Sequence, residues 1–252
     1  INANFTYKNP KLSGTARSSI SVSLEVDNEE AITGQTKLLT TEEIRVRALG
    51  AYSSQNRAVT KQDYMSLVYR MPSNFGSVKR ANIVQDKKSI KRNLNLFVIS
   101  EDSSGKLVEA SSTVKNNLRS WLNKYKMIND TVDILDGRIA NIGIQFEAIG
   151  NPEKNSNEVL MVCLNALKSE FSGHFYFGQP FYISDIYRIL NDLPEVLDVK
   201  TVKITSQYGT NYSGSEYEAE ANISTDGRFI KVPEDVILEV KYPNTDIIGV
   251  VI

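Results

Sequence analysis

The chain has 252 residues, in which 29 Lys and Arg nearly balance 30 Asp and Glu, and hydrophobic residues make up 41% of the total. This composition is typical of a folded protein with its own core. A nearly neutral chain carries no overall field that would hold nucleic acid or an anionic membrane, and no stretch approaches the roughly 20 apolar residues of a membrane-spanning helix. We therefore expect protein partners, with neither nucleic acid nor membrane among them. Because the sequence opens at Ile1 without methionine, we interpret it as a fragment of a longer chain.

The first part of the chain divides into a β-rich segment over residues 1–40 and a helical section over 41–76. In the first segment, alternating apolar residues predict a half-buried strand: Ile20, Val22, Leu24 and Val26. In the second, a helix is predicted to begin at Thr41, with four apolar residues on one face: Ile44, Ala48, Leu49 and Tyr52. A second helix is predicted to begin at Thr60, with a capping signal at Asp63, and to end at Pro72.

The remainder is predicted to be an α+β domain over residues 77–205, followed by a C-terminal loop and strands over 206–252. Strands are expected over 78–85, 94–100, 131–149 and 196–205, the first two as a hairpin and the third as a long strand or strand pair. Helices are expected over 111–127, over 157–171 and from Ser184 as N-cap. Residues 206–233 favour loop or a loosely paired hairpin, and strands are expected near 236–242 and at the apolar C-terminal end. The predicted fold class is α+β, with sheets covered by helices.

The residues that usually carry catalysis or bind metals are few. Cys163 and His174 are the single cysteine and histidine, which excludes a disulfide framework and a zinc site of the usual nitrogen and sulfur kind. Cys163 falls on the predicted inner face of a helix, and His174 lies in a run of aromatic residues. Asp130, Asp133 and Asp136 lack the glycine and closing glutamate of a calcium loop, and no glycine-rich phosphate loop is present. We therefore expect a protein that is not an enzyme, with no catalytic residues, no cofactor and no metal.

A basic cluster surrounds the loop of the predicted hairpin: Lys79, Arg80, Lys87, Lys88, Lys91 and Arg92. Such a cluster is typical of a solvated hairpin tip whose lysines protect a strand edge, of a surface for an acidic partner protein, or of a nucleic-acid contact. The nucleic-acid alternative is the weakest, since no aromatic residues interleave the cluster. Lys87 and Lys88 are taken as candidate interface residues.

Two segments resemble the J-like baseplate family of contractile tails. That family carries a loop of the form Gln-x-Arg-Ala-Val-Thr-x-x-Asp-Tyr, which this chain matches at Gln55, Arg57, Ala58, Val59, Thr60, Asp63 and Tyr64. A later stretch over 178–187 leads through Ser184 and Asp185 into a short helix, followed by a strand of the form Pro-x-Val-x-x-Val at 194–199. The resemblance covers about residues 41 to 205 and is greatest to the C-terminal part of the large wedge proteins of T-even-type phage baseplates. One departure is Asn56, where many relatives have glycine.

The resemblance implies a structural role in a virion. It implies a baseplate wedge component that pairs with itself as a homodimer, binds other wedge proteins and joins a sixfold ring around the hub, which rearranges on host contact. It places the protein in the tail baseplate, assembled in the host cytoplasm. Alternatives that stay open are a module of a related contractile injection system, a carbohydrate- or receptor-binding tail protein, and an enzyme acting on cell-wall glycan, which would need two carboxylates in a cleft.

Candidate interface residues are those with charged, aromatic or apolar side chains that could contact a partner protein. Arg57 is expected either to set the angle between two helical segments or to hold an acidic partner group through its planar guanidinium. The aromatic run at Phe175, Tyr176 and Phe177, with Phe181 and Tyr182, is expected either to form a contact surface or to belong to the core. Tyr176 and Phe177 are the residues chosen from it, and the apolar C-terminal end is a further candidate.

Overall fold

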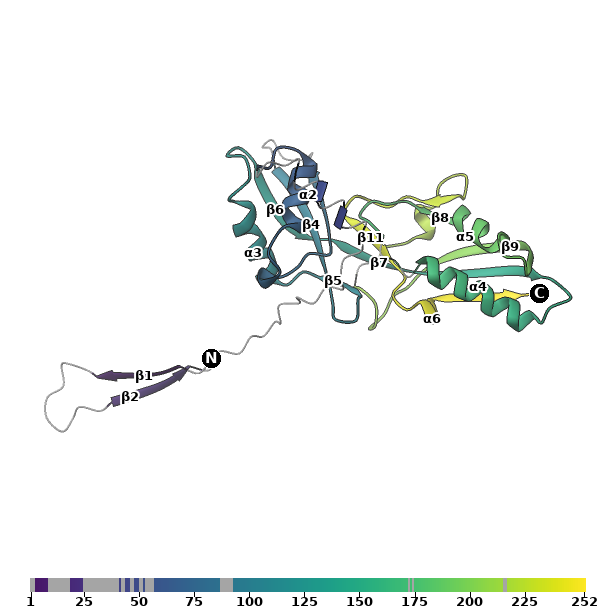
Figure 1. The fold of residues 1–252 in the computed structure, drawn as a ribbon, viewed down its shortest axis with the longest axis horizontal. Helices are drawn as coiled ribbons and strands as arrows, with labels where there is room; N and C mark the ends of the chain where they lie inside the picture. The colour runs from purple at the N-terminus through teal and green to yellow at the C-terminus, as the bar shows by residue number, and fades with distance from the viewer. Residues whose placement is uncertain are drawn as a thin grey trace. The chain divides into compact units, whose positions relative to one another are not determined.

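The computed structural model describes residues 3–8, 19–24, 41, 44, 45, 48, 49, 52, 57–86, 93–171, 173, 175–214 and 217–252. The chain divides into two compact units, Ile1–Ile32 and Thr33–Ile252. In the first unit, β1 (Ala3–Lys8) pairs antiparallel with β2 (Ser19–Leu24), with Phe5 opposite Val22 (Figure 1). The strand predicted from the alternation that begins at Ile20 is therefore confirmed over its described residues.

The second unit begins with a helical section. Its described residues between 41 and 52 are helical, as predicted: Thr41, Ile44, Arg45, Ala48, Leu49 and Tyr52. All six are exposed, so the apolar face predicted for this helix lies at the surface. The second predicted helix is α2 (Lys61–Tyr69), with Thr60 as its N-cap. It ends before the short turn η2 (Ser73–Phe75), which Pro72 precedes.

The first sheet is built around a central strand, β4 (Asn93–Glu101). β3 (Arg80–Gln85) pairs antiparallel with it on one side, which confirms the predicted hairpin. On the other side, β6 (Thr131–Asp136) runs parallel to β4 and β5 (Leu107–Glu109) runs antiparallel to it. The helix predicted over 111–127 is α3 (Ser112–Leu122), which ends five residues earlier than expected. Leu67 of α2 and Leu118 of α3 pack with Leu96 of β4 in the core of this lobe.

Gly137 is the single residue that connects the first sheet to the second. β6 ends at Asp136 in the first sheet, and β7 (Arg138–Gly150) begins one residue after Gly137 as the central strand of the second. The predicted long strand or strand pair is thus two strands that belong to different sheets. A Cβ built on Gly137 would lie 2.4 Å from the Phe177 ring, so glycine is the residue that lets the ring close over the junction.

The second sheet, like the first, is built around one central strand. β9 (Val196–Ser206) pairs antiparallel with β7 on one side. On the other side, β11 (Val236–Glu239) and β12 (Ile247–Val251) run parallel to β7, one along each half of it. α6 (Pro243–Asp246), which was not predicted, joins these two short strands. The strand expected near 236–242 ends at Glu239.

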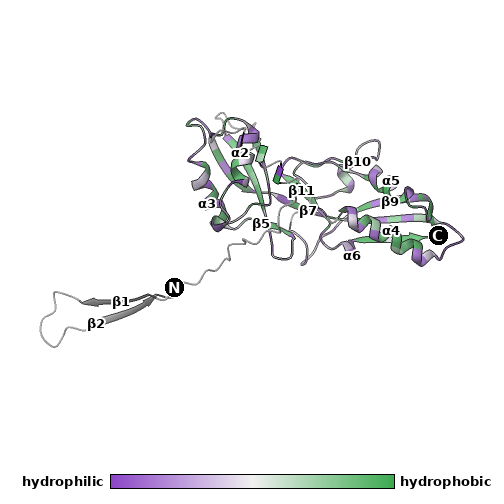
Figure 2. Cartoon of the chain, in the orientation of Figure 1, coloured by the Kyte–Doolittle hydropathy of each residue, from purple (hydrophilic) through white to green (hydrophobic). Residues whose placement is uncertain are grey.

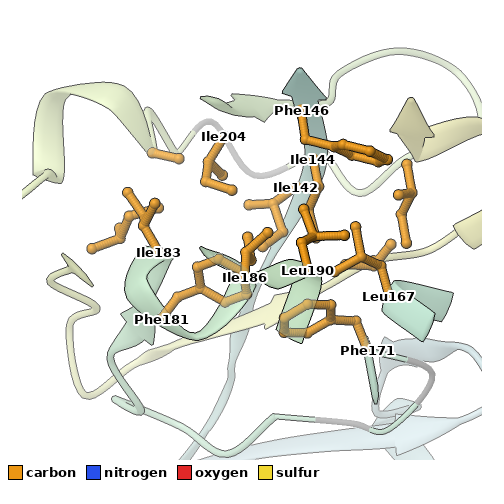
Figure 3. Packing of buried hydrophobic residues seen from close by; sticks show 14 of the residues in the cluster. Ile142, Ile144, Phe146, Leu167, Phe171, Phe181, Ile183, Ile186, Leu190 and Ile204 are labelled. Carbon is orange, nitrogen blue, oxygen red and sulfur yellow. The ribbon is translucent and has the colours of Figure 1, made fainter. Parts of the chain in front are cut away.

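Two helices cover one face of the second sheet. α4 (Ser156–Phe171) packs on β12, and α5 (Ile183–Asn191) packs on β9 (Figure 1). Their apolar stripes meet the inward residues of β7, as Figure 3 shows for Ile142, Ile144, Leu167, Ile186 and Leu190.

The prediction for the start of α5 is wrong in one respect. Tyr182 occupies the N-cap position with no side-chain capping bond, and Ser184 lies inside the first turn. The backbone N–H groups of Ile183 and Ser184 donate to the Arg228 carbonyl instead, at 2.8 and 3.4 Å. A distant loop therefore satisfies the helix end that a local cap was expected to satisfy.

Short elements complete the lobe: β8 (Phe181–Tyr182), η3 (Glu220–Asn222) and β10 (Phe229–Ile230). β10 pairs antiparallel with β8, and most of the region predicted as loop over 206–233 is loop in its described residues. The fold class is α+β, as predicted. Within the described part of the chain, no helix has the length and apolar character needed to cross a bilayer.

Candidate protein-interaction surfaces

The segment that carries the family resemblance forms a rigid corner at the start of α2. Asp63 N–H donates to Thr60 Oγ1 at 3.2 Å, while Asp63 Oδ2 accepts from the backbone N–H groups of Thr60 at 2.8 Å and Val59 at 3.1 Å. This is the reciprocal capping box predicted from the sequence. It satisfies donors that the first turn of the helix would otherwise leave without partners.

The same hydrogen bonds stabilise the ionised form of the Asp63 carboxylate. Burial acts to raise the pKa of the Asp63 carboxyl, but hydrogen bonds from Thr60 and Val59 and the positive charge of Arg57 together lower it below its usual value. Arg57 itself is exposed. It therefore supports the capping carboxylate through its charge and also presents its guanidinium at the surface, so both predicted roles of Arg57 stay open.

Two members of the motif, Ala58 and Tyr64, point inward, whereas Val59 and Thr60 are exposed. Ala58 is buried and its N–H donates to the Tyr125 carbonyl at 2.9 Å, just after α3. The Tyr64 hydroxyl donates to buried Asp130 Oδ2 at 2.8 Å. Gln55, the first residue of the motif, lies outside the described residues. The sequence predicted that Tyr64 begins the buried stripe of α2, but it gave no sign of the partner at Asp130, which lies 66 residues away.

The three aspartates considered for calcium are used separately. Asp130 accepts from Tyr64, Asp136 pairs with Lys115 at 2.9 Å, and Asp133 is exposed. Over the described ranges, no three His, Cys, Asp or Glu side chains come together as a metal-binding group.

The aromatic run after α4 is divided between core and surface. Phe181 is buried, and Phe175 is half-buried with its ring 5.6 Å from that of Phe181. Phe177 is half-buried and packs on the small apolar cluster at the junction of the two sheets. Tyr176 and Tyr182 are the two exposed members, and Tyr176 is 55% exposed. Of the two candidates chosen from this run, Tyr176 alone thus presents an exposed ring.

The basic cluster does not form one solvated patch. Lys79 is buried and its Nζ lies 2.9 Å from buried Glu101 Oε2. Arg80 is also buried, donates to the Phe175 carbonyl at 3.3 Å, and places its guanidinium carbon 4.5 Å from the centre of the Tyr176 ring. Lys79 therefore makes its ion pair within the first sheet, and Arg80 links that sheet to the aromatic run. Lys87 and Lys88, the candidates for an acidic partner, lie outside the described residues, as do Lys91 and Arg92.

A buried polar network joins the first sheet to the second. Glu239 of β11 accepts from the Leu107 N–H at 2.8 Å and from Asn141 Nδ2 at 2.9 Å. Asn141 in turn accepts from both the N–H and the hydroxyl of Ser213, at 2.8 Å each. Burial raises the pKa of the Glu239 carboxyl, against these hydrogen bonds and the charge of Lys241, which lower it. The sequence carried no local sign of this network, because its members come from four separate segments.

A second set of contacts lies at the same junction, next to the start of β11. Arg138 Nε pairs with Asp235 Oδ2 at 2.8 Å, and Asn82 Nδ2 donates to the Glu234 carbonyl at 2.7 Å. Between the two sets, Ile99, Leu107, Ile139 and Ile237 form a small apolar core. The second unit thus contains two hydrophobic cores, and the small apolar cluster and these hydrogen bonds join them.

An open hollow of about 460 Å³ lies beside the 207–214 loop. Its described lining is Tyr208, Gly209, Ser213, Gly214 and Glu218. Glu218 is the one carboxylate among these lining residues, whereas glycan hydrolysis uses two facing carboxylates.

Cys163 and His174 are the remaining side chains with reactive chemistry. Cys163 is buried on the inner face of α4, as predicted, and burial together with the nearby charge of Glu195 raises the pKa of its thiol. A raised pKa keeps the thiol in its less reactive protonated form. His174 lies outside the described residues.

The apolar C-terminal end is the other surface named from the sequence. It forms β12, and its outward residues Ile248, Val250 and Ile252 are 55%, 58% and 63% exposed.

No family model matches the sequence, and no curated protein matches it. Among solved structures, the chain is similar to one in the cryo-EM structure of the anti-feeding prophage (AFP) baseplate, 6-fold symmetrised, at 10% sequence identity and a TM-score of 0.47. The similarity covers 92% of this chain and 47% of that chain, so this chain spans less than half the length of its neighbour.

Proposed function

We propose that this chain is a structural component of a contractile-tail baseplate, where it acts by binding proteins and catalyses no reaction. The observation that supports this proposal is the segment from Arg57 to Tyr64. It resembles the J-like baseplate family residue by residue, and its members make the capping box and the buried Tyr64–Asp130 bond that set the start of α2. The buried contacts of Ala58 and Tyr64, together with the capping box, are expected where a family shares a scaffold.

The finer proposal is a wedge component. In it the chain pairs with itself, binds other wedge proteins and enters a sixfold ring that rearranges on host contact. Such a ring needs interfaces with two packings of similar free energy. Exposed Arg57 and Tyr176 are the described residues offered for these contacts, beside Lys87 and Lys88.

A receptor- or carbohydrate-binding tail protein is the second candidate. The observation that favours it is the hollow lined by Tyr208 and Glu218, since a half-exposed tyrosine beside a carboxylate suits a sugar. The remaining alternative is a module of a related contractile injection system. The same structural features would support that role, because it too would act by binding baseplate proteins.

Self-association is the part of the proposal that is most simply measured. We expect the solution mass of the chain, followed by sedimentation across about a hundredfold range of concentration, to rise from that of the 28.2 kDa monomer to that of the dimer. A monomer at every concentration would contradict the homodimer and favour the receptor-binding candidate.

A further inference from the structure

Among the described residues, β12 lies at an edge of the second sheet. Ile252 donates its N–H to the Ala148 carbonyl at 3.0 Å and accepts from the Gly150 N–H at 3.2 Å. Because successive residues of a strand turn their peptide groups to opposite sides, Gly249 and Val251 direct theirs away from β7. On that side, β12 pairs with no strand in the part of the chain that the structure describes.

Three features that commonly protect an edge strand from pairing are absent from β12. Natural edge strands are protected by charged side chains, proline or bulges. From Ile247 to Ile252 there is no ionisable side chain and no proline, and the register with β7 is regular. Figure 2 shows β12 as hydrophobic along nearly its whole length.

The opposite edge of the same sheet provides an internal comparison. β9 carries exposed Lys200 and Lys203, and its register with β7 shifts at two places. In addition, its Val202 N–H donates to the Tyr187 hydroxyl of α5 at 3.1 Å. The sheet is therefore protected at β9 and open to pairing at β12.

We propose that β12 pairs antiparallel with β12 of a second copy of this chain about a twofold axis. This inference rests on the self-association proposed above and names its surface. The two sheets then continue as one, in the order β9–β7–β12–β12–β7–β9, and the outward peptide groups of Gly249 and Val251 find partners.

Charge complementarity favours a second copy as the occupant. β12 brings no charge to β12, so no like charges meet, whereas two copies of β9 would set lysines close together. On the exposed face, Val250 lies directly opposite Glu147 of β7, whose carboxylate is already paired with Lys200 of its own chain at 2.9 Å. A charged foreign strand would find no partner here, while a self-complementary one closes with twofold symmetry.

Two lysine substitutions in one row of the sheet test the pairing. Val250→Lys and Thr201→Lys both add a lysine opposite Glu147 on exposed positions, one on β12 and one on β9. In a twofold interface, Val250→Lys brings two new lysines close together, so we expect dimerisation to weaken by at least about a hundredfold. Thr201→Lys is expected to leave the dimer unchanged, and unfolding measurements on both variants check that the fold is kept.

Backbone amide exchange identifies the strand itself. We expect the Gly249 and Val251 amides to exchange slowly in the wild-type dimer and quickly in the Val250→Lys variant. A dimer that survives Val250→Lys with these two amides still fast would overturn the β12 pairing while leaving self-association intact. A wild-type chain that stays monomeric at every concentration would overturn both.

Discussion

At the scale of single residues, Asp63 shows how one carboxylate supports the corner before α2. Its pKa is lowered in the folded protein by hydrogen bonds from Thr60 and Val59 and by the charge of Arg57, which together outweigh the effect of burial. A lowered folded-state pKa means that the carboxylate contributes stability above its unfolded pKa, and that this contribution is lost as pH falls through the folded pKa.

The prediction for Asp63 is a pH-dependent loss of stability on substitution. We expect Asp63→Asn to lower the free energy of unfolding by about 1 kcal/mol at neutral pH, the usual effect of losing a helix-capping interaction. The difference should shrink as pH falls below about 4, the usual pKa of an unfolded aspartate, and on through the lower folded-state pKa. Urea unfolding at several pH values measures it. An unchanged difference down to strong acid would contradict the role given to the ionised carboxylate.

Tyr176 and Phe177 are neighbours with opposite environments. Tyr176 is exposed and its ring is covered by the Arg80 guanidinium, whereas Phe177 packs on the junction cluster. We expect Tyr176→Ala to cost about 1 kcal/mol, the value of a cation–π contact between a half-exposed ring and the buried Arg80 guanidinium. Phe177→Ala should cost about 2 kcal/mol or more, because it opens space over Gly137.

The same pair of variants separates surface from core. Thermal unfolding gives the two stabilities, and sedimentation of the Tyr176→Ala variant shows whether Tyr176 belongs to the proposed self-contact. If Tyr176→Ala unfolded the protein more easily than Phe177→Ala, the division of the aromatic run between surface and core would be incorrect.

At the scale of elements, the passage from β6 to β7 depends on Gly137. A Cβ there would lie 2.4 Å from the Phe177 ring and 2.9 Å from Ile99 Cδ1. We expect Gly137→Ala to lower the free energy of unfolding by about 1–3 kcal/mol, as overpacking does in a filled core. Gly173→Ala is the matched control, since a Cβ at Gly173 meets nothing within 4 Å.

Unfolding of the two alanine variants side by side measures this effect. Adding Phe177→Ala to Gly137→Ala should recover part of the loss, because the ring that the new methyl group strikes is then absent. Equal stabilities for Gly137→Ala and Gly173→Ala would show that the junction does not need a glycine.

The elements themselves were mostly predictable, because their signals are local. The spacing of Tyr64 and Leu67 with the Thr60 cap located α2, and the stripe from Val159 to Phe171 located α4. What failed depended on distant partners. Ser184 has the chemistry of an N-cap, but the Arg228 carbonyl takes the amides of that helix end.

The candidate site was less predictable than the fold, for the same physical reason. Lys79 and Arg80 belong to a basic run in sequence, yet their partners Glu101 and Phe175 hold both of them inside. The carboxylate of Glu239 has no local signature, since its donors lie on β5 and β7. Sequence periodicity reports which residues turn inward, but it does not report what they meet.

At the scale of the whole molecule, the second unit consists of two helix-covered sheets joined at one junction. The junction combines the Glu239 network, the Arg138–Asp235 ion pair and the small apolar cluster around Ile139. Both lobes keep their own cores, and within the described residues β12 pairs with no strand besides β7. Such a molecule is suited to joining neighbours while holding its own shape, which is the property that the proposed baseplate role requires.

The most direct measurement of that role is the position of the chain on intact particles. Antibody fragments raised against the folded chain would be bound to particles from its source and viewed by electron microscopy. The proposed function predicts label at the baseplate end of a contractile tail, arranged with sixfold symmetry. Label at fibre tips, or on no tail structure, would contradict it.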